Sequence, residues 1–268
     1  GASLELGGKN PMIVLADANL DRAAECAVGA CFNNTGQLCF AIERLYVAEP
    51  VRQAFLDRFL ERTGRLRIGA AFDYSAEIGS LSSRAHFDKV SSHVGDAVTK
   101  GATVLAGGKP RPDLGPWFYE PTVLAGVRAG MLVADEETFG PVVSVYPFET
   151  DDEAVQLAND TAFGLNASVF TGDLRRGVAL ARRIRTGSVN VNEAYHAVWG
   201  SLDLPLGGMG ASGVGRRQGR EGILRFTETQ GIAVQRLHGI KPLPGQTYDQ
   251  FAKSMTVGLR ALRRLGRP

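Results

Sequence analysis

Short apolar runs alternate along this chain with longer segments whose apolar residues recur at helical spacing. The run Pro11–Leu15 precedes an Ala- and Cys-rich segment at 20–32, and the strand-like run Arg44–Val47 precedes a helical pattern at 51–60. Uniformly apolar strands separated by helices predict a parallel sheet that is covered on both faces. The alternation continues to residue 192, so we expect an α/β fold with a mostly parallel, doubly wound sheet.

The later segments repeat this pattern as far as Gly219, where the chain changes character. Predicted helices cover 82–100, 151–159 (capped by Asp151) and 174–184, and predicted strands cover 102–105, 122–124, 142–146, 167–170 and 188–192. A short helix at 222–227 then precedes the strand Ile232–Gln235, which no helix returns to the sheet. A strand edge that is left free in this way can pair with another chain.

Composition excludes several classes of protein. The 268 residues are 44% hydrophobic, enough for one sizeable core or two smaller ones, and the net charge of +2 does not indicate a nucleic-acid partner. No apolar run approaches a membrane span and no signal-peptide pattern is visible, so we expect a cytoplasmic protein without a membrane partner. Cys26, Cys31 and Cys39 have no metal-ligand spacing and form no even disulfide set, so we expect no metal.

The segment Asn33–Phe40 holds the candidate nucleophile, Cys39. Small polar residues and a glycine end the preceding helix, which places Cys39 on a loop behind a rigid element. A thiol reacts as its thiolate and needs an electropositive setting or a base. Glu5 is the candidate carboxylate, because a strand–helix unit between the two residues would return both ends to one edge of the sheet. The alternatives are a small buried hydrophobe for Cys39 and a surface charge for Glu5.

Four motifs occur in order along nearly the whole chain. They are Glu-Leu-Gly-Gly-Lys-Asn-Pro at 5–11, Asn-Thr-Gly-Gln-Leu-Cys at 34–39, Glu-Glu-Thr-Phe-Gly-Pro at 136–141, and Pro-Leu-Gly-Gly at 205–208 with Ser-Gly-Val-Gly-Arg at 212–216. Together they resemble the C-terminal catalytic half of the aldehyde dehydrogenase superfamily.

This resemblance implies a thiol-based oxidation of an aldehyde that uses NAD or NADP. Cys39 would attack the aldehyde to form a thiohemiacetal, which loses hydride to the nicotinamide and becomes a thioester. Glu5 would then act as the general base for the water that hydrolyses the thioester.

The resemblance also implies cofactor-binding residues. Leu6 and Gly7 belong to a turn beside the nicotinamide, Glu137 matches a carboxylate that holds the ribose hydroxyls, and Phe139 matches an aromatic side chain beside the ring. Glu137 could equally be an exposed loop acid and Phe139 a core residue. We interpret the remaining residues of the first motif, Lys9 and Asn10, as structural.

Within the superfamily, the segment 188–215 with Asn-Glu-Ala-Tyr at 192–195 is most similar to bacterial succinate-semialdehyde dehydrogenases. Two residues depart from that group. Asn33 stands where better-known members carry an arginine for the substrate carboxylate, and Phe40 stands where some carry a second cysteine.

Full-length members of the superfamily place a dinucleotide-binding domain before the first motif, and here four residues precede Glu5. We therefore expect the end of that domain at 1–7, the catalytic domain at 8–218, a return helix and oligomerisation strand at 219–240, and a linker with an amphipathic tail helix at 241–268. A separate dinucleotide-binding half is then a candidate partner. The residues that select NAD or NADP would lie in that half. The resemblance also implies homo-oligomers that form through the strand near Ile232, because the matching strand in the superfamily pairs with another subunit.

Two other functions remain open on sequence grounds. The chain could be a non-catalytic assembly module that pairs through the Ile232 strand, or a thiol esterase that uses Cys39 without a cofactor. The tail 246–265 predicts a basic amphipathic helix, which would dock onto protein or lie on a membrane surface.

Overall fold

A computed structural model describes residues 2–71, 73, 75–235 and 241–266 of the chain. The chain divides into two compact units, Gly1–Thr227 and Glu228–Pro268. The first unit contains both sheets and all of the candidate site residues.

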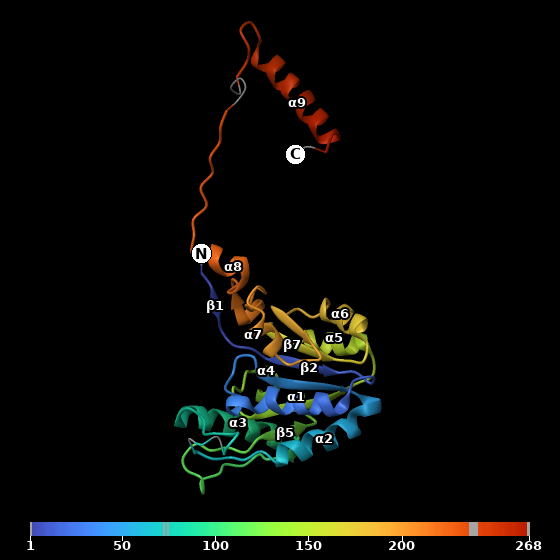
Figure 1. The fold of residues 1–268 in the computed structure, drawn as a ribbon, viewed down its shortest axis with the longest axis vertical. Helices are drawn as coiled ribbons and strands as arrows, with labels where there is room; N and C mark the ends of the chain where they lie inside the picture. The colour runs from blue at the N-terminus through green and yellow to red at the C-terminus, as the bar shows by residue number, and fades with distance from the viewer. Residues whose placement is uncertain (1, 72, 74, 236–240, 267–268) are drawn as a thin grey trace. The chain divides into compact units, whose positions relative to one another are not determined.

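The first unit is built on a seven-stranded sheet with the order β4-β5-β6-β3-β2-β7-β8 (Figure 1). Every neighbouring pair is parallel except the edge pair β4 and β5. A separate antiparallel sheet pairs β1 with β9. The strands are β1 (Leu4–Glu5), β2 (Asn10–Val14), β3 (Ile42–Ala48), β4 (Thr103–Ala106), β5 (Thr122–Ala125), β6 (Val142–Phe148), β7 (Asn166–Phe170), β8 (Ser188–Val191) and β9 (Gly213–Val214).

Helices cover both faces of this sheet, which confirms the predicted fold class. Met12 and Val14 of β2 pack into a core with α1 and α2, whereas Ile13 and Leu15 face α5 and α6. Figure 1 shows these two helix layers on opposite sides of β2. The helices of this unit are α1 (Leu20–Phe32), α2 (Arg52–Gly64), α3 (Arg84–Thr99), α4 (Leu132–Asp135), α5 (Asp151–Asn159), α6 (Leu174–Ala181), α7 (His196–Gly200) and α8 (Gly219–Leu224), with 3₁₀ turns η1 (Asn33–Gly36), η2 (Glu49–Val51) and η3 (Gly210–Ser212).

Helix α1 carries the chain from β2 to the candidate nucleophile. Asn19 caps its first turn by accepting a hydrogen bond from the Arg22 backbone N–H at 3.1 Å. The buried alanines Ala23, Ala24 and Ala27 let the helix lie close to the sheet. The helix therefore delivers the loop that follows it to a fixed position beside the sheet.

One detail of the sequence prediction is wrong, and another stays a prediction. Thr150, and not Asp151, caps α5, because the Thr150 hydroxyl accepts from the Glu153 N–H. Residues 228–235, which include the predicted strand Ile232–Gln235, lie outside any strand. A strand needs a second edge to satisfy its backbone hydrogen bonds, and the edge predicted for these residues belongs to another copy of the chain.

The second unit contains α9 (Tyr248–Arg264), which confirms the predicted tail helix. Thr247 and Gln250 form a reciprocal capping box at its start, and Arg263 and Arg264 lie in its last turn. The capping box satisfies backbone N–H groups of the first turn, and the two arginines interact favourably with the negative end of the helix dipole. Residues within and next to α9 therefore stabilise both of its ends.

Gly36 gives a direct test of how the loop after α1 is held. Its φ is +68°, and a Cβ there would lie 2.1 Å from the Gly140 carbonyl oxygen. We expect Gly36→Ala to lower the free energy of unfolding by at least about 2 kcal/mol in urea titrations, because the left-handed conformation and the contact both penalise alanine.

Gly64→Ala is the matched control. Gly64 is the last residue of α2 and nothing lies within 4 Å of a Cβ there. Alanine should raise stability at this position by up to about 1 kcal/mol. If both variants lost the same free energy of unfolding, this account of the Gly36 turn would be contradicted.

Candidate active site

The candidate site lies at the amino edge of the large sheet. Cys39 precedes β3, the Gly7–Gly8 turn precedes β2, and residues 136–141 precede β6. Because β6, β3 and β2 are parallel neighbours, their leading turns meet at one edge. This confirms the expectation that the strand–helix unit returns Glu5 and Cys39 to the same side of the fold.

The turn before Cys39 is conformationally strained. Asn34, Thr35 and Gly36 have φ values of 53°, 58° and 68°, and a positive φ is rare for a β-branched residue such as threonine. The buried Thr35 hydroxyl accepts from the Gly79 N–H at 3.1 Å, which helps to hold this conformation. Strain that is fixed by its surroundings is a feature of functional sites.

The Cys39 backbone is held from the opposite side by β2. The Asn10 side chain donates to the Cys39 carbonyl at 2.7 Å and to the Ala41 carbonyl at 2.8 Å. A Cβ on Gly8 would lie 2.7 Å from the Cys39 carbonyl oxygen, so this close approach requires glycine. These contacts fix the half-buried Cys39 side chain relative to the first motif.

A buried ion pair joins the three leading turns. Lys9 Nζ contacts Glu43 Oε2 at 2.5 Å and donates to the Glu136 carbonyl at 2.7 Å. Glu43 in turn accepts from the backbone N–H groups of Thr138 and Phe139 at 2.8–3.0 Å. Burial lowers the pKa of Lys9, and the charge of Glu43 opposes that shift. Lys9 and Asn10 are thus structural, as the sequence indicated.

Glu137 lies directly against the glycine turn. Its Oε1 accepts from the Gly8 N–H at 2.7 Å, and a Cβ on Gly7, whose φ is +113°, would lie 2.6 Å from its Oε2. Burial raises the pKa of Glu137. The predicted cofactor residues Gly7 and Glu137 therefore share one small region next to Cys39.

Glu5 reaches the site from the small antiparallel sheet. β1 pairs with β9, which places Glu5 opposite Gly213. Its carboxylate forms an ion pair with Arg217, with Glu5 Oε1 2.9 Å from Arg217 Nε. The sequence analysis did not identify Arg217, because it follows the last motif by one residue and no local pattern points from it to Glu5.

Of the two settings that would activate a thiol, an electropositive site or a base, the charges around Cys39 do not provide the first. Burial raises the pKa of the Cys39 thiol, and the charges of Glu5 and Glu137 raise it further, whereas Arg217 lowers it. In this chain the group is therefore a protonated thiol at neutral pH, and its reaction requires a neighbouring base.

The other predicted cofactor residues lie at the margin of this cluster. Phe139 adopts φ +56°, and its ring stacks on His86 at a centroid distance of 5.7 Å. Leu6 is 60% exposed, and its N–H donates to the Ser212 carbonyl at 3.1 Å.

The histidines do not provide a partner for the thiol within the described residues. His86 stacks on Phe139, His93 lies 3.2 Å from the Thr138 hydroxyl, and His196 contacts Glu193. Burial lowers the pKa of His93, which keeps that ring neutral. His238 lies outside the described residues. No group of three metal-ligating side chains occurs among 2–71, 73, 75–235 and 241–266.

Aromatic side chains from α7 border the loop that carries Cys39. Trp199 packs edge-on against Phe40 at 5.5 Å, and the Tyr195 hydroxyl accepts from the Asn33 amide at 3.2 Å. The two positions that depart from the resembled group, Asn33 and Phe40, thus both contact this helix region.

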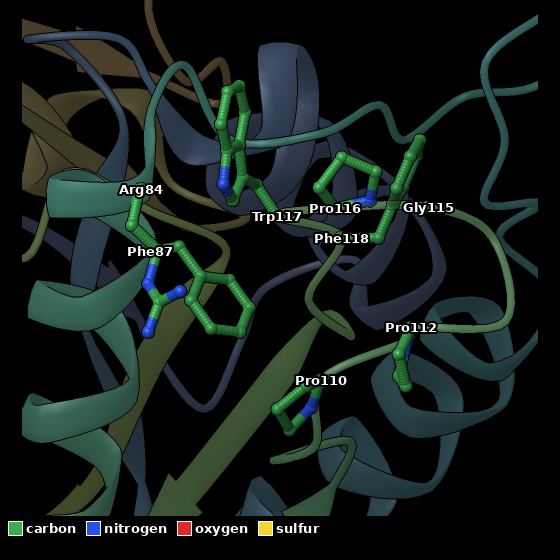
Figure 2. Close-up of a pocket in the computed structure, with 8 residues that line it drawn as sticks. All are labelled: Arg84, Phe87, Pro110, Pro112, Gly115, Pro116, Trp117 and Phe118. Carbon is green, nitrogen blue, oxygen red and sulfur yellow. The ribbon is translucent and has the colours of Figure 1, made fainter.

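A separate pocket lies between α3 and the proline-rich loop at 110–118, and Figure 2 shows the residues that line it. Its walls are prolines and the aromatic rings of Phe87, Trp117 and Phe118, with Arg84 at one side. The Arg84 guanidinium already binds Asp88 at 2.9 Å, and no lining residue is a carboxylate or a thiol. The chemistry of the Cys39 cluster is absent from this pocket.

Comparisons with known proteins agree with the geometry. A sequence profile described as the aldehyde dehydrogenase family matches residues 1–232. A Mycobacterium tuberculosis protein with the provisional name succinate-semialdehyde dehydrogenase (NADP+) 2 is 52% identical over 265 residues, which cover 99% of this chain and 51% of that protein. The Schizosaccharomyces pombe succinate-semialdehyde dehydrogenase (NADP+) 1 is 37% identical, over 88% of this chain and 47% of that protein. The chain spans about half the length of the curated relatives it matches.

Solved structures give the same result. An NAD-dependent aldehyde dehydrogenase from Sinorhizobium meliloti matches with a TM-score of 0.84 and 41% identity, over 91% of this chain and 48% of that one. A betaine aldehyde dehydrogenase from Staphylococcus aureus in complex with NAD+ matches with a TM-score of 0.78 and 35% identity, over 88% and 48%. In the part of the chain that the structure describes, no helix is long and apolar enough to cross a membrane.

Removing one member of the buried Lys9–Glu43 ion pair should destabilise the amino edge of the large sheet. We expect Lys9→Met to lower the free energy of unfolding by about 3–5 kcal/mol, because Glu43 would remain buried without its counter-charge. Lys100→Met is the control, since Lys100 pairs with Asp96 on the surface, where solvent screens the charges. Urea titrations that give equal losses for the two variants would contradict this role of Lys9.

The raised pKa of the thiol has a measurable consequence. Iodoacetamide alkylates the thiolate, so the rate of Cys39 alkylation should rise with pH. We expect the midpoint of this rise to lie above that of free cysteine, as measured by peptide mass spectrometry. Glu137→Gln removes a negative charge, which should lower the pKa of Cys39 and speed its alkylation at pH 8. Glu61→Gln, on the outer surface of α2, should have no effect. A midpoint below that of free cysteine would overturn this description of the site.

Proposed function

We propose that this chain, which belongs to the aldehyde dehydrogenase family, carries the thiol and the base of an enzyme that oxidises an aldehyde to its carboxylic acid. The observation that carries the proposal is the clustering of Cys39, Glu5 and Glu137 around the Gly7–Gly8 turn. These residues come from separate motifs, and the buried Lys9–Glu43 pair holds their turns together.

The first step is the attack of the Cys39 sulfur on the aldehyde carbon. Because burial and two carboxylates raise the pKa of the thiol, its proton must pass to a base during the attack, and Glu5 is close enough for its charge to influence the thiol. The product is the alkoxide of a thiohemiacetal, which becomes a Cys39 thioester when hydride leaves the same carbon. Glu5 releases the thiol proton to solvent before the second step.

The second step is hydrolysis of the thioester. Glu5 accepts a proton from water while the water oxygen bonds to the thioester carbonyl carbon. The carbon–sulfur bond then breaks, which releases the carboxylic acid and returns the proton to the sulfur or to solvent. The carboxylate alternates in this way between its charged and protonated forms, as a general base does.

The residues present fit a nicotinamide dinucleotide. Gly7 has a positive φ, and a Cβ there would collide with the Glu137 carboxylate. Because glycine has no side chain, a ligand could approach the backbone closely at this turn. Glu137 would hold the ribose hydroxyls, and Leu6, Gly7 and Phe139 would lie beside the ring. When bound, the oxidised dinucleotide supplies the hydride acceptor and a positive charge beside the two carboxylates. The names of the relatives above favour NADP, although NAD occupies the structure from Staphylococcus aureus.

Succinate semialdehyde is the substrate that the relatives' names support. Asn33 donates its amide to Tyr195 and brings no charge to the site. Arg217 is bound to Glu5. A cation for the substrate carboxylate would therefore come from a region of the protein outside this cluster.

Association through residues 228–235 is a second proposal. Ile232 and Val234 are 83% and 72% exposed, and exposed β-branched residues of this kind are suited to pairing with a strand of another copy. This would give the homo-oligomer that the sequence predicts. It is compatible with catalysis and also with a purely structural role.

The test combines this chain with the portion of the Mycobacterium tuberculosis relative that it does not cover, supplied as a separate polypeptide. We expect NADP-dependent oxidation of succinate semialdehyde in the mixture. Cys39→Ala should abolish it, and Glu5→Gln should slow turnover by about 10²- to 10⁴-fold, the usual contribution of a general base. The measurement is NADPH absorbance.

Cys26→Ser is the matched control, because Cys26 is half-buried on α1 and outside the cluster. It should leave turnover unchanged. Ester hydrolysis that requires Cys39 but ignores NADP would instead identify a thiol esterase. Self-association without turnover in any mixture would leave only the assembly role.

A further inference from the structure

The Glu5–Arg217 ion pair joins the two ends of the first unit. Arg217 Nε lies 2.9 Å from Glu5 Oε1, with 47% of the arginine and 31% of the glutamate side chain exposed. Ion pairs this exposed contribute little to stability, because solvent screens them. Stability therefore does not explain the pair, and the effect to consider is the position that Arg217 gives to the Glu5 carboxylate.

The backbone on both sides of the pair is fixed by hydrogen bonds. β1 and β9 align Glu5 with Gly213, and the Leu6 N–H donates to the Ser212 carbonyl at 3.1 Å. Leu206 and Arg217 exchange two backbone hydrogen bonds of 2.6 and 2.7 Å.

Glycine is required for this arrangement at one position. Gly213 has φ +125°, and a Cβ there would lie 2.0 Å from the Leu4 carbonyl oxygen. The fold therefore presents the Arg217 side chain to Glu5 from a constrained backbone on each side.

We propose that Arg217 is the positioning residue of Glu5, whose side chain it holds in place near Cys39 through their ion pair. This inference rests on the proposed role of Glu5 as the base. A carboxylate that is bound through one oxygen retains further lone pairs with which to accept a proton from water. Arg217 positions the reacting group through Glu5, and its charge also lowers the pKa of the Cys39 thiol directly.

The charges at the thiol support this assignment. Glu5 and Glu137 both raise the pKa of Cys39, and Arg217 lowers it. Arg217 thus offsets part of the negative charge that a base beside a thiol introduces. Without it, an unrestrained Glu5 would oppose formation of the thiolate more strongly.

The test measures the rate at which iodoacetamide alkylates Cys39 in the full chain, at several pH values and at low salt. Peptide mass spectrometry gives the alkylated fraction. We expect Arg217→Gln to slow alkylation at pH 8 by about two- to five-fold, because Glu5 loses the partner that restrains its charge near the thiol, with a smaller direct contribution from the lost charge of Arg217. Arg217→Lys should restore most of the rate. The control is Arg220→Gln, three residues away on the exposed side of α8, which should match the unaltered chain.

The double variant Arg217→Gln/Glu5→Gln separates positioning from a direct effect. If Arg217 acts through Glu5, its substitution should change the alkylation rate far less when Glu5 is already neutral. An undiminished effect in the Glu5→Gln background would overturn the proposal. Equal rates for Arg217→Gln and Arg220→Gln would overturn it as well. Circular dichroism on each variant excludes unfolding as the cause.

The same variants in the reconstituted enzyme distinguish this inference from the proposed function. Arg217→Gln should slow thioester hydrolysis more than thioester formation, which appears as an initial burst of NADPH before slow turnover. If no mixture oxidises any aldehyde, the proposed function fails, while the alkylation data still decide whether Arg217 positions Glu5.

Discussion

The candidate site depends on the buried ion pair between Lys9 and Glu43. A buried charge is tolerated only with a partner and further hydrogen bonds, and Glu43 obtains these from Lys9 and from the N–H groups of Thr138 and Phe139. One carboxylate therefore fixes the leading turns of β2, β3 and β6 against one another. Glu137 takes its position from this arrangement, since it follows the Glu136 carbonyl that Lys9 binds.

The thiol stands in an acidic setting at the amino edge of the sheet. Its two carboxylates raise the pKa of Cys39, and one arginine, Arg217, lowers it. A protein that needed only a reactive thiolate would not be built in this way. The proposed function accounts for this setting, because it requires a base to remain next to the sulfur for a later hydrolysis.

Much of this could be predicted from the sequence, because the alternation of apolar strands and helices is a local signal and the motifs are contiguous. The return of Glu5 and Cys39 to one edge follows from a strand–helix unit. The sequence could not show the pairing of β1 with β9 or the contact of Glu5 with Arg217, which join residues far apart in the chain. The sequence also could not show that the residues near Ile232 lie outside any strand in a single copy of the chain. The roles of Glu137 and Phe139 toward a cofactor, and the domain boundaries, stay predictions.

The most direct test of the central claim is the covalent intermediate itself. Glu5→Gln should slow hydrolysis of the acyl group on Cys39 more than its formation, so that the acyl group accumulates. Intact-mass and peptide mass spectrometry of this variant, after reaction with succinate semialdehyde, NADP and the complementing polypeptide, should find a thioester on Cys39 that the unaltered chain does not accumulate. An acyl group on Cys26 or Cys31, or none in a mixture that turns over, would contradict the account.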